Sequence, residues 1–229
     1  MRKACFVLVV IAMATFGAPA SSKAPATWDG LVQVKAKNVE LAYLLPHADF
    51  RAYSKVMFDP AEVAFRKNWL RDYNRSTATL GGRISDSEAR EKLELARQTL
   101  DKLFADAFVK EGYQIVTAPG PDVLRLSVGV IDLSVTAPDT SVSTRSRTYS
   151  YDAGEATLVV EARDSVTNQL LGRAIDERAA GEGPTYRRTY ASNEADFEAL
   201  FDNWARISAR ALGNLKAMSP VDTDGIKKQ

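Results

Sequence analysis

The sequence predicts an α+β fold, a two-layer sandwich in which a mainly antiparallel sheet carries two amphipathic helices packed on one face. Apolar and polar residues alternate in Val123–Val135 and again from Ala156 onward, as in strands with one buried face. Two long segments, one after Ser85 and one over Asn193–Lys216, repeat apolar residues at three- and four-residue spacing, which is typical of helices with one apolar face.

The first twenty residues predict a signal peptide, residues 1–20. Arg2 and Lys3 precede an uncharged run, and the small residues Ala18-Pro19-Ala20 follow it. The run is shorter than the ~20 residues that span a bilayer, which favours cleavage over an uncleaved anchor. Cys5, the only cysteine, lies before the run, whereas the cysteine of a lipoprotein follows it. We therefore expect a periplasmic or secreted protein with no lipid anchor and no disulfide.

Composition and charge predict the rest of the domain plan. After the leader we expect a flexible mature N-terminus (21–37), a single α+β domain (38–218) and a polar tail (219–229). The chain of 229 residues is 45% hydrophobic and 26% charged, ordinary values for a globular protein. Its formal net charge of +1 provides no overall field toward nucleic acid, so we expect no nucleic-acid partner.

The first half of the domain predicts short strands followed by a long helix. Three short apolar runs are strand candidates: Asn38–Leu45, Ser54–Phe58 and Val63–Phe65. The polar, glycine-containing segment Arg71–Arg83 is a predicted loop. Ser85 and Glu88 have the spacing of a capping box, so the helix is expected to begin here and to end at Gly112.

The second half predicts a long strand, a hairpin and a final helix. Tyr113–Thr117 is a further strand candidate, and the alternation in Val123–Val135 changes phase near Ile131-Asp132, which predicts a β-bulge. The next two alternating runs are joined by the turn Asp164–Asn168 and predict an antiparallel hairpin. Two polar segments beside it are predicted loops: 137–153 and 181–190. The helix Asn193–Lys216 follows.

No residue pattern predicts catalysis, a metal or a cofactor. The single histidine, His47, cannot form a metal cluster, and the sequence contains no nucleophile elbow or phosphate-binding loop. Asp132 and Asp176 are the carboxylates that a hydrolase would use, but a dyad requires both to face one cleft, which the sequence does not determine. We accordingly predict no catalytic residue, and we expect both carboxylates to be structural.

Arginine and tyrosine are concentrated in two segments, one on each side of the predicted hairpin. Antiparallel strands return the chain to the end where it entered, so the two segments are expected to lie together. Arginine binds carboxylates and phosphates, and tyrosine stacks, so the pooled patch could bind a glycan, a lipid headgroup or an acidic protein surface. The alternative is a pair of solvated loops. The candidate binding residues are Arg145, Arg147, Tyr149, Tyr151, Tyr186, Arg187, Arg188 and Tyr190.

Several motifs together resemble a bacterial family known as domain of unknown function 3313. Four motifs carry the resemblance. They are Tyr53-Ser54-Lys55-Val56-Met57-Phe58-Asp59-Pro60 followed by Val63-Ala64-Phe65, the strand Pro119-Gly120-Pro121-Asp122-Val123-Leu124-Arg125-Leu126, the hairpin Gly154-Glu155-Ala156-Thr157-Leu158 with Asp164-Ser165 and Gln169-Leu170-Leu171, and the helix segment Phe201-Asp202-Asn203-Trp204-Ala205. The resemblance implies a bacterial envelope protein, in many members a lipoprotein, and it brings no catalytic residues.

Three functions follow as hypotheses. The first is a non-enzymatic accessory or interaction domain that binds another envelope protein or a cell-wall or membrane component. The second is an envelope hydrolase that uses carboxylates. The third is a carrier of a small ligand or glycan, which would require an apolar pocket between the sheet and the helices.

Overall fold

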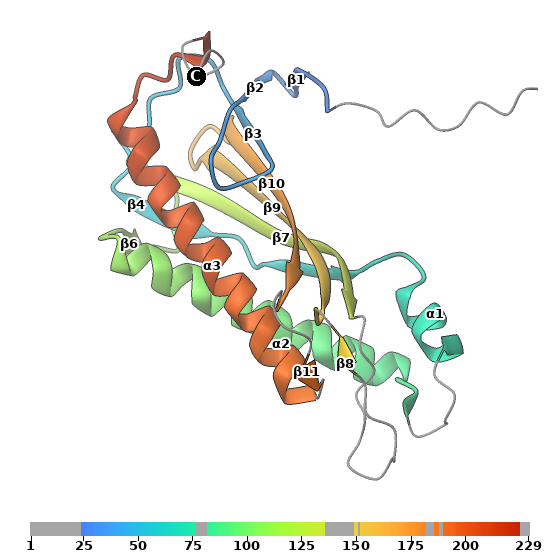
Figure 1. Ribbon diagram of the computed structural model, residues 1–229. Coiled ribbons are helices and arrows are strands. Elements are labelled where there is room, and N and C mark those ends of the chain that lie inside the picture. The colour runs from blue at the N-terminus through green and yellow to red at the C-terminus, as the bar shows by residue number, and fades with distance from the viewer. Residues whose placement is uncertain are drawn as a thin grey trace, which may run out of the picture.

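The computed structural model describes residues 24–76, 82–135, 149–150, 152–181, 186–187 and 190–224. Within these residues the chain forms an α+β fold, shown in Figure 1. The elements are β1 (Thr27–Trp28), β2 (Leu31–Val34), β3 (Leu41–Leu44), β4 (Lys55–Phe58), β5 (Glu62–Phe65), α1 (Trp69–Ser76), α2 (Asp86–Lys110), β6 (Gln114–Ile115), β7 (Val123–Val135), β8 (Tyr149–Ser150), β9 (Gly154–Asp164), β10 (Leu170–Ala180), β11 (Tyr186–Arg187) and α3 (Tyr190–Ala217).

The main sheet has nine strands and is mixed. Its order is β1-β2-β3-β10-β9-β7-β4-β6, and β5 also pairs with β7. The predicted hairpin is confirmed, because β9 and β10 pair antiparallel along their whole length. Strand β7 pairs antiparallel with β9, but β4 and β5 both run parallel to β7. The two parallel strands follow one another along the same edge of β7, separated by a break that contains Pro60, which cannot donate to a ladder.

The predicted bulge in β7 is present. The register between β7 and β9 shifts between Ile131 and Ser134, and Asp132 has a φ of 52°. Before this shift, Leu124, Leu126, Val128 and Val130 are buried on one face, as the alternation predicted. The bulge changes which residues of the strand face the core, so that Leu133 is also buried.

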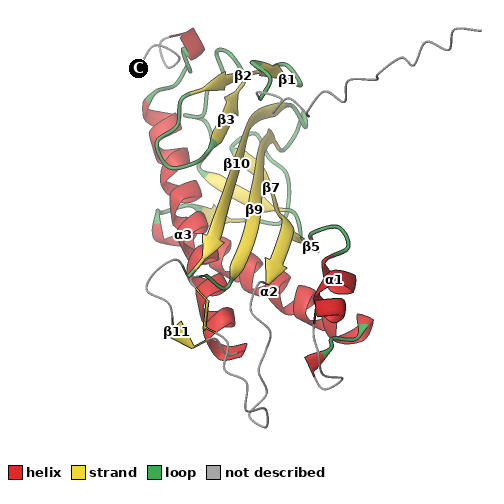
Figure 2. Ribbon diagram, turned by 45° about the vertical axis from the view of Figure 1, so that its right-hand side comes forward, coloured by secondary structure: helices red, strands yellow, loops and turns green. Residues whose placement is uncertain are grey.

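Helices α2 and α3 pack against each other and against one face of the sheet, so the predicted two-layer arrangement is confirmed. Figure 2 shows both helices on the same side of β7, β9 and β10. Ser85 caps α2 as predicted, since its hydroxyl accepts from the amide of Glu88, whose carboxylate accepts from the amide of Ser85 at 2.8 Å. Phe104 and Phe108 of α2 and Trp204 of α3 are among the most deeply buried side chains of the core.

The N-terminal segment 21–37 was predicted to be flexible, and for residues 27–34 this was wrong. Strand β2 pairs with β3, and β1 pairs with β2, so both extend the sheet. Leu31 is completely buried, which explains why the segment is ordered. The leader, residues 1–20, lies outside the described residues.

Two other segments predicted to be irregular carry regular structure or packing. The predicted loop 71–83 overlaps α1, in which Tyr73 is buried. In the tail, Val221 is fully buried, and its amide donates to the carbonyl of Ala48 at 2.9 Å. Residues 219–224 therefore belong to the folded domain, while 225–229 lie outside the described residues. No described helix combines the length and apolarity that a membrane crossing requires.

Candidate functional site

Asp176 is a structural carboxylate at the centre of the sheet–helix interface. Its side chain is 6% exposed, and its Oδ2 accepts a hydrogen bond from Nε1 of Trp204 at 2.7 Å and forms an ion pair with Nε of Arg178 at 2.6 Å. Its Oδ1 accepts from the backbone amide of Glu40 at 3.0 Å. A carboxylate with these two donors and one cation joins β10, α3 and the segment before β3, which accounts for its burial.

Asp132 lies elsewhere and does not face Asp176. It is exposed on the β7 bulge, and its charge acts on Arg66. Nη2 of Arg66 donates to Glu155 at 2.8 Å, and this bond, together with the charges of Glu155 and Asp132, raises the pKa of Arg66. Neither Asp132 nor Asp176 lines either of the two pockets described below. The described residues thus do not bring the two carboxylates to one cleft.

His47 is an exposed turn residue with a φ of 61°. Its backbone amide donates to the carbonyl of Val221 at 3.0 Å, so the position serves to hold the C-terminal segment. Within the described ranges, no group of three His, Cys, Asp or Glu side chains is placed to hold a metal ion.

The two Arg/Tyr segments meet through their backbones. Strands β8 and β11 pair antiparallel, with Tyr149 opposite Arg187 and Tyr186 opposite Ser150. We call this two-stranded element the Arg/Tyr ribbon; in the chain β8 precedes β9, and β11 lies between β10 and α3. The ribbon lies at one end of the molecule (Figure 1). Tyr190 is the first residue of α3. The other candidates lie outside the described residues: Arg145, Arg147, Tyr151 and Arg188.

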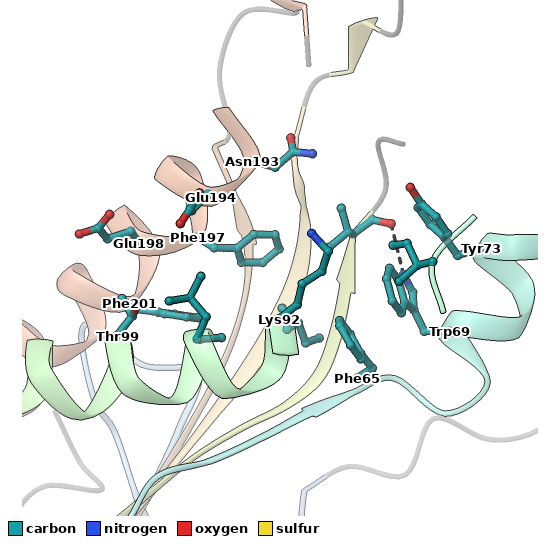
Figure 3. Close-up of a pocket in the computed structure, with 15 residues that line it drawn as sticks. Phe65, Trp69, Tyr73, Lys92, Thr99, Asn193, Glu194, Phe197, Glu198 and Phe201 are labelled. Carbon is teal, nitrogen blue, oxygen red and sulfur yellow. Dashed lines mark hydrogen bonds between the residues drawn. The ribbon is translucent and has the colours of Figure 1, made fainter. Parts of the chain in front are cut away.

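An aromatic pocket of about 140 Å³ lies at the same end of the molecule (Figure 3). One wall consists of Phe65, Trp69 and Tyr73, with ring centroids 4.1 Å apart for the first pair and 5.1 Å apart for the second. Phe197 and Phe201 of α3 form the opposite wall. Because stacked aromatic rings are rigid and apolar, the pocket is suited to hold an apolar side chain or ring.

The local sequence explains the aromatic wall. Asn68 has a φ of 66° and turns the chain from β5 into α1. Phe65, Trp69 and Tyr73 then recur every fourth residue, which places Trp69 and Tyr73 on one face of α1. Nε1 of Trp69 donates to the carbonyl of Val135 at 3.2 Å, the dashed bond in Figure 3, and ties α1 to the end of β7.

Charged groups lie at the edges of the pocket. Lys92 of α2 lies between Phe197 and the aromatic wall, and Glu194 and Glu198 come from the first turns of α3 (Figure 3). Leu95 also lines the pocket and is 45% exposed, a high value for a leucine. The pocket therefore has an apolar interior and a charged edge, the arrangement found at binding interfaces.

Sequence analysis did not predict this pocket. The four-residue spacing of Phe65, Trp69 and Tyr73 was the available signal, but the polar residues between them indicated a loop. The opposite wall was interpreted correctly as the apolar face of a helix, since Phe201 is 2% exposed. Only the tertiary structure brings the two walls together.

Comparison with solved structures finds distant likenesses. PelC from Paraburkholderia phytofirmans, solved as a dodecamer, is 11% identical with a TM-score of 0.36, covering 80% of this chain and 96% of that one. A protein of family DUF330 from Xanthomonas campestris is 12% identical with a TM-score of 0.39, covering 76% and 91%. A minor lipoprotein from Acinetobacter baumannii is 11% identical with a TM-score of 0.32, covering 71% and 94%. Scores this low do not transfer an assembly or an activity to this chain.

No curated protein matches the chain. A family does match, over residues 20–207, a range that includes all four motifs on which the resemblance was based. This chain belongs to the family described as "Protein of unknown function (DUF3313)".

Proposed function

We propose that this chain is an exported, non-enzymatic interaction domain of the bacterial cell envelope. The observation that carries the proposal is the aromatic pocket, which shares one end of the molecule with the Arg/Tyr ribbon. Protein interfaces concentrate their binding energy in a few Trp, Tyr and Arg side chains and in the pockets that receive them. This end supplies Trp69 and Tyr73 in the pocket wall and Arg187 in the ribbon.

The partner suited to this end is another envelope protein that presents an apolar anchor residue beside acidic side chains. The anchor would enter the aromatic pocket, where it would leave water and contact the rings of Phe65 and Trp69. Acidic neighbours of the anchor would pair with Arg187 of the ribbon. Export is supported by the leader, in which a basic start, an apolar run and small residues follow one another.

Site-specific photo-crosslinking in the native bacterium tests where the partner binds. A photoreactive residue is placed at Leu95, at the pocket, or at Val166, which is 63% exposed in the β9–β10 turn at the opposite end. We expect a discrete adduct from position 95 and none from position 166. Equal adducts from both positions, or an adduct from position 166 alone, would contradict the proposal.

The Arg/Tyr segment that contains β11 is tested by Arg187→Ala combined with Arg188→Ala. We expect the adduct at position 95 to fall several-fold, because the acidic neighbours of the anchor lose their partners. Surface changes in loops usually alter the free energy of unfolding by no more than ~0.5 kcal/mol, so thermal unfolding should be unchanged. The matched control is Arg71→Ala, an exposed arginine of α1 that does not line the pocket. An undiminished adduct in the double variant would refute a role for the ribbon.

Export itself is tested by the intact mass of the protein from each cell fraction. We expect the mass of a chain cleaved after Ala20 in the soluble periplasmic fraction. A full-length or lipid-bearing mass in the membrane fraction would contradict the predicted leader and move the protein to the membrane surface.

A further inference from the structure

A second and larger cavity of about 400 Å³ lies between the sheet and the C-terminal half of α3. It is lined by β3, β9 and β10, by α3, and by the connector 35–39 between β2 and β3. It sits at the half of the sheet away from the Arg/Tyr ribbon, near the β9–β10 turn (Figure 1). Its volume falls within the range of roughly 300–1,000 Å³ that is typical of small-molecule sites.

Small side chains on three neighbouring strands leave this space open. Ala174 of β10 pairs with Ala42 of β3, and Gly172 of β10 pairs with Ala162 of β9. All four residues line the cavity and form its floor. Farther along the same face, Asp176 reaches Trp204 of α3 and closes the gap, because both side chains extend across it. The hollow therefore begins where the sheet side chains become too short to reach the helix.

The opposite wall makes the cavity elongated and apolar. Ile207, Ala211 and Leu215 line it at four-residue spacing along α3, a stretch of about 12 Å at ~1.5 Å per residue. Further apolar residues come from the core at the closed side, among them Phe50 and Phe108, and both are almost fully buried. A long apolar slot of this kind fits an extended alkyl chain better than a compact polar molecule.

The charged groups at the cavity are all basic. Lys35, Lys37, Arg173 and Arg210 line it, and no carboxylate does so among the residues described. Arg173 is already paired with Asp29 and Glu161. The two lysines are exposed and make no hydrogen bond or ion pair within the described part of the chain. Arg210 has only a long ion pair with Glu111, at 3.5 Å between two exposed side chains. An anionic group at the mouth would thus meet two lysines that are free to pair with it.

The connector that carries these lysines is held in place. Nη2 of Arg178 donates to the carbonyl of Asn38 at 2.6 Å, and the amide of Glu40 donates to Asp176 at 3.0 Å. These bonds fix the end of the connector to β10, so Lys35 and Lys37 belong to the cavity mouth in the chain without ligand. A mouth that is positioned in advance loses less conformational freedom when it binds.

We propose that this cavity binds a single-chain anionic amphiphile, with its alkyl chain between the alanine floor and α3 and its carboxylate or phosphate head group at Lys35 and Lys37. This site is separate from the partner-binding end proposed above and does not depend on it. Charge complementarity selects the occupant: a cationic amphiphile would meet four basic groups, and a neutral one would leave the lysines without a partner.

Calorimetric titration with four matched dodecyl probes tests the ligand class on the protein as isolated from its native cell. The probes are dodecanoate, dodecyl phosphate, dodecanol and dodecyltrimethylammonium, each below its micelle concentration. We expect the two anions to bind at least tenfold more tightly than the cation, with dodecanol between them, and the tighter anion identifies the head group. Absence of binding for all four probes, or equal binding of anions and cation, would overturn the proposal.

Variants that fill the cavity test its position. We expect Ala211→Trp and Ala174→Phe, on opposite walls, each to weaken dodecanoate binding at least tenfold. Ala211 is exposed, so its variant keeps the test valid if Ala174→Phe does not fold. The matched control is Ala199→Trp, an exposed alanine of α3 that does not line the cavity. Unchanged binding in both filling variants would place the amphiphile elsewhere and refute the site.

The head-group contact is tested by Lys35→Gln with Lys37→Gln. We expect dodecanoate binding to weaken several-fold while dodecanol binding stays the same, because only the charged probe loses its partners. Lys67→Gln, an exposed lysine between β5 and α1, serves as the control and should alter neither. An equal loss for both probes would show that the lysines act through structure, contrary to the proposal.

Discussion

The two halves of the sheet–helix interface differ although the same strands form both. In the half nearer the Arg/Tyr ribbon, Ala156 and Leu158 of β9 are each 1% exposed and belong to a dense core. In the half nearer the β9–β10 turn, Ala162 of the same strand and face lines the 400 Å³ cavity. The hydrophobic alternation is equally regular in both halves. Side-chain size, rather than pattern, therefore decides whether an interface is packed or hollow.

The hydrogen bond between Asp176 and Trp204 joins the two halves. Two residues from Asp176 along β10, Ala174 already lines the cavity, and Asp176 also holds the end of the connector by accepting from the amide of Glu40. Loss of this carboxylate should therefore loosen the packed half and the cavity mouth together. The three predictions below use matched pairs of substitutions, in order of decreasing effect.

Replacement of Asp176 by Asn should have the largest effect. The amide keeps the shape of the side chain but loses the charge that pairs with Arg178, and it leaves one acceptor oxygen for the two donors, Trp204 and Glu40. We expect the free energy of unfolding to fall by about 2–3 kcal/mol in a urea titration. Asp132→Asn, at an exposed position whose φ suits asparagine, should change it by no more than ~0.5 kcal/mol. Similar values for both variants would contradict the role of Asp176.

Replacement of an alanine by valine should change the free energy of unfolding in opposite directions in the two halves. In the packed half, Ala156→Val should destabilise the fold by about 1–3 kcal/mol, because it overfills a core without space. In the hollow half, Ala162→Val should stabilise it by up to about 1 kcal/mol, because the added methyl groups leave water. Thermal unfolding of both variants without ligand measures the difference. The same sign for both would show that the cavity is not an open space in solution.

The smallest effect is expected on the other face of β9, where the side chain of Glu161 is less exposed than that of Glu155. Burial opposes ionisation of Glu161, but hydrogen bonds from Arg163 and Arg173 outweigh it and lower the pKa of its carboxyl. A carboxyl whose pKa is lower in the folded state contributes stability above its unfolded pKa of roughly 4.3, and this stability is lost as the pH falls through the folded pKa.

We therefore expect the free energy of unfolding to fall as the pH drops below about 4.3, and Glu161→Gln to make that fall shallower by less than about 1 kcal/mol. Urea titrations between pH 6 and pH 3, with about one titration at each pH unit, provide the measurement. Glu155→Gln is the control, because Glu155 pairs with Arg66 at the surface, with side chains 49% and 45% exposed. An identical acid dependence in both variants and the unaltered chain would argue against the role of Glu161.

The elements that could be predicted are those whose signals are local. The capping box at Ser85 fixed the start of α2, the alternation in β7 gave its buried face, and the phase change at Ile131-Asp132 gave its bulge. The turn at Asp164–Asn168 gave the hairpin. Each depends on residues within a few positions of one another, so no knowledge of distant neighbours was needed.

The elements that were missed depend on distant partners. Strands β1 and β2 are only two and four residues long, but β3 provides an edge with which β2 pairs, and β2 provides one for β1. Helix α1 is mostly polar and is held by the bond of Trp69 to Val135 and by the side chain of Asn74, which bonds the backbone of Ile84 in both directions at 2.7 and 2.8 Å. In these segments tertiary contacts override weak local propensity.

The candidate sites also divide into those with a local sequence signal and those that depend on distant residues. The sequence identified the Arg/Tyr segments, and the structure pairs Tyr149 with Arg187 across β8 and β11. The aromatic pocket and the basic cavity could not be predicted, because each is lined by at least four elements that are far apart in the chain. The four-residue spacing from Phe65 to Tyr73 is visible in the sequence, but the side chains that face it are not.

The sequence by itself determined the α+β class, the long helix α2, the bulged strand β7, the β9–β10 hairpin and the family to which the chain belongs. Only the tertiary structure decided that β4 and β5 run parallel to β7 and that one half of the interface is hollow. It also decided that Asp176 is a buried carboxylate that binds the sheet to α3, rather than one of a catalytic pair of carboxylates. The physical reason is that periodicity records which face of an element avoids water, whereas a pocket depends on how far side chains from separate elements reach across the space between them.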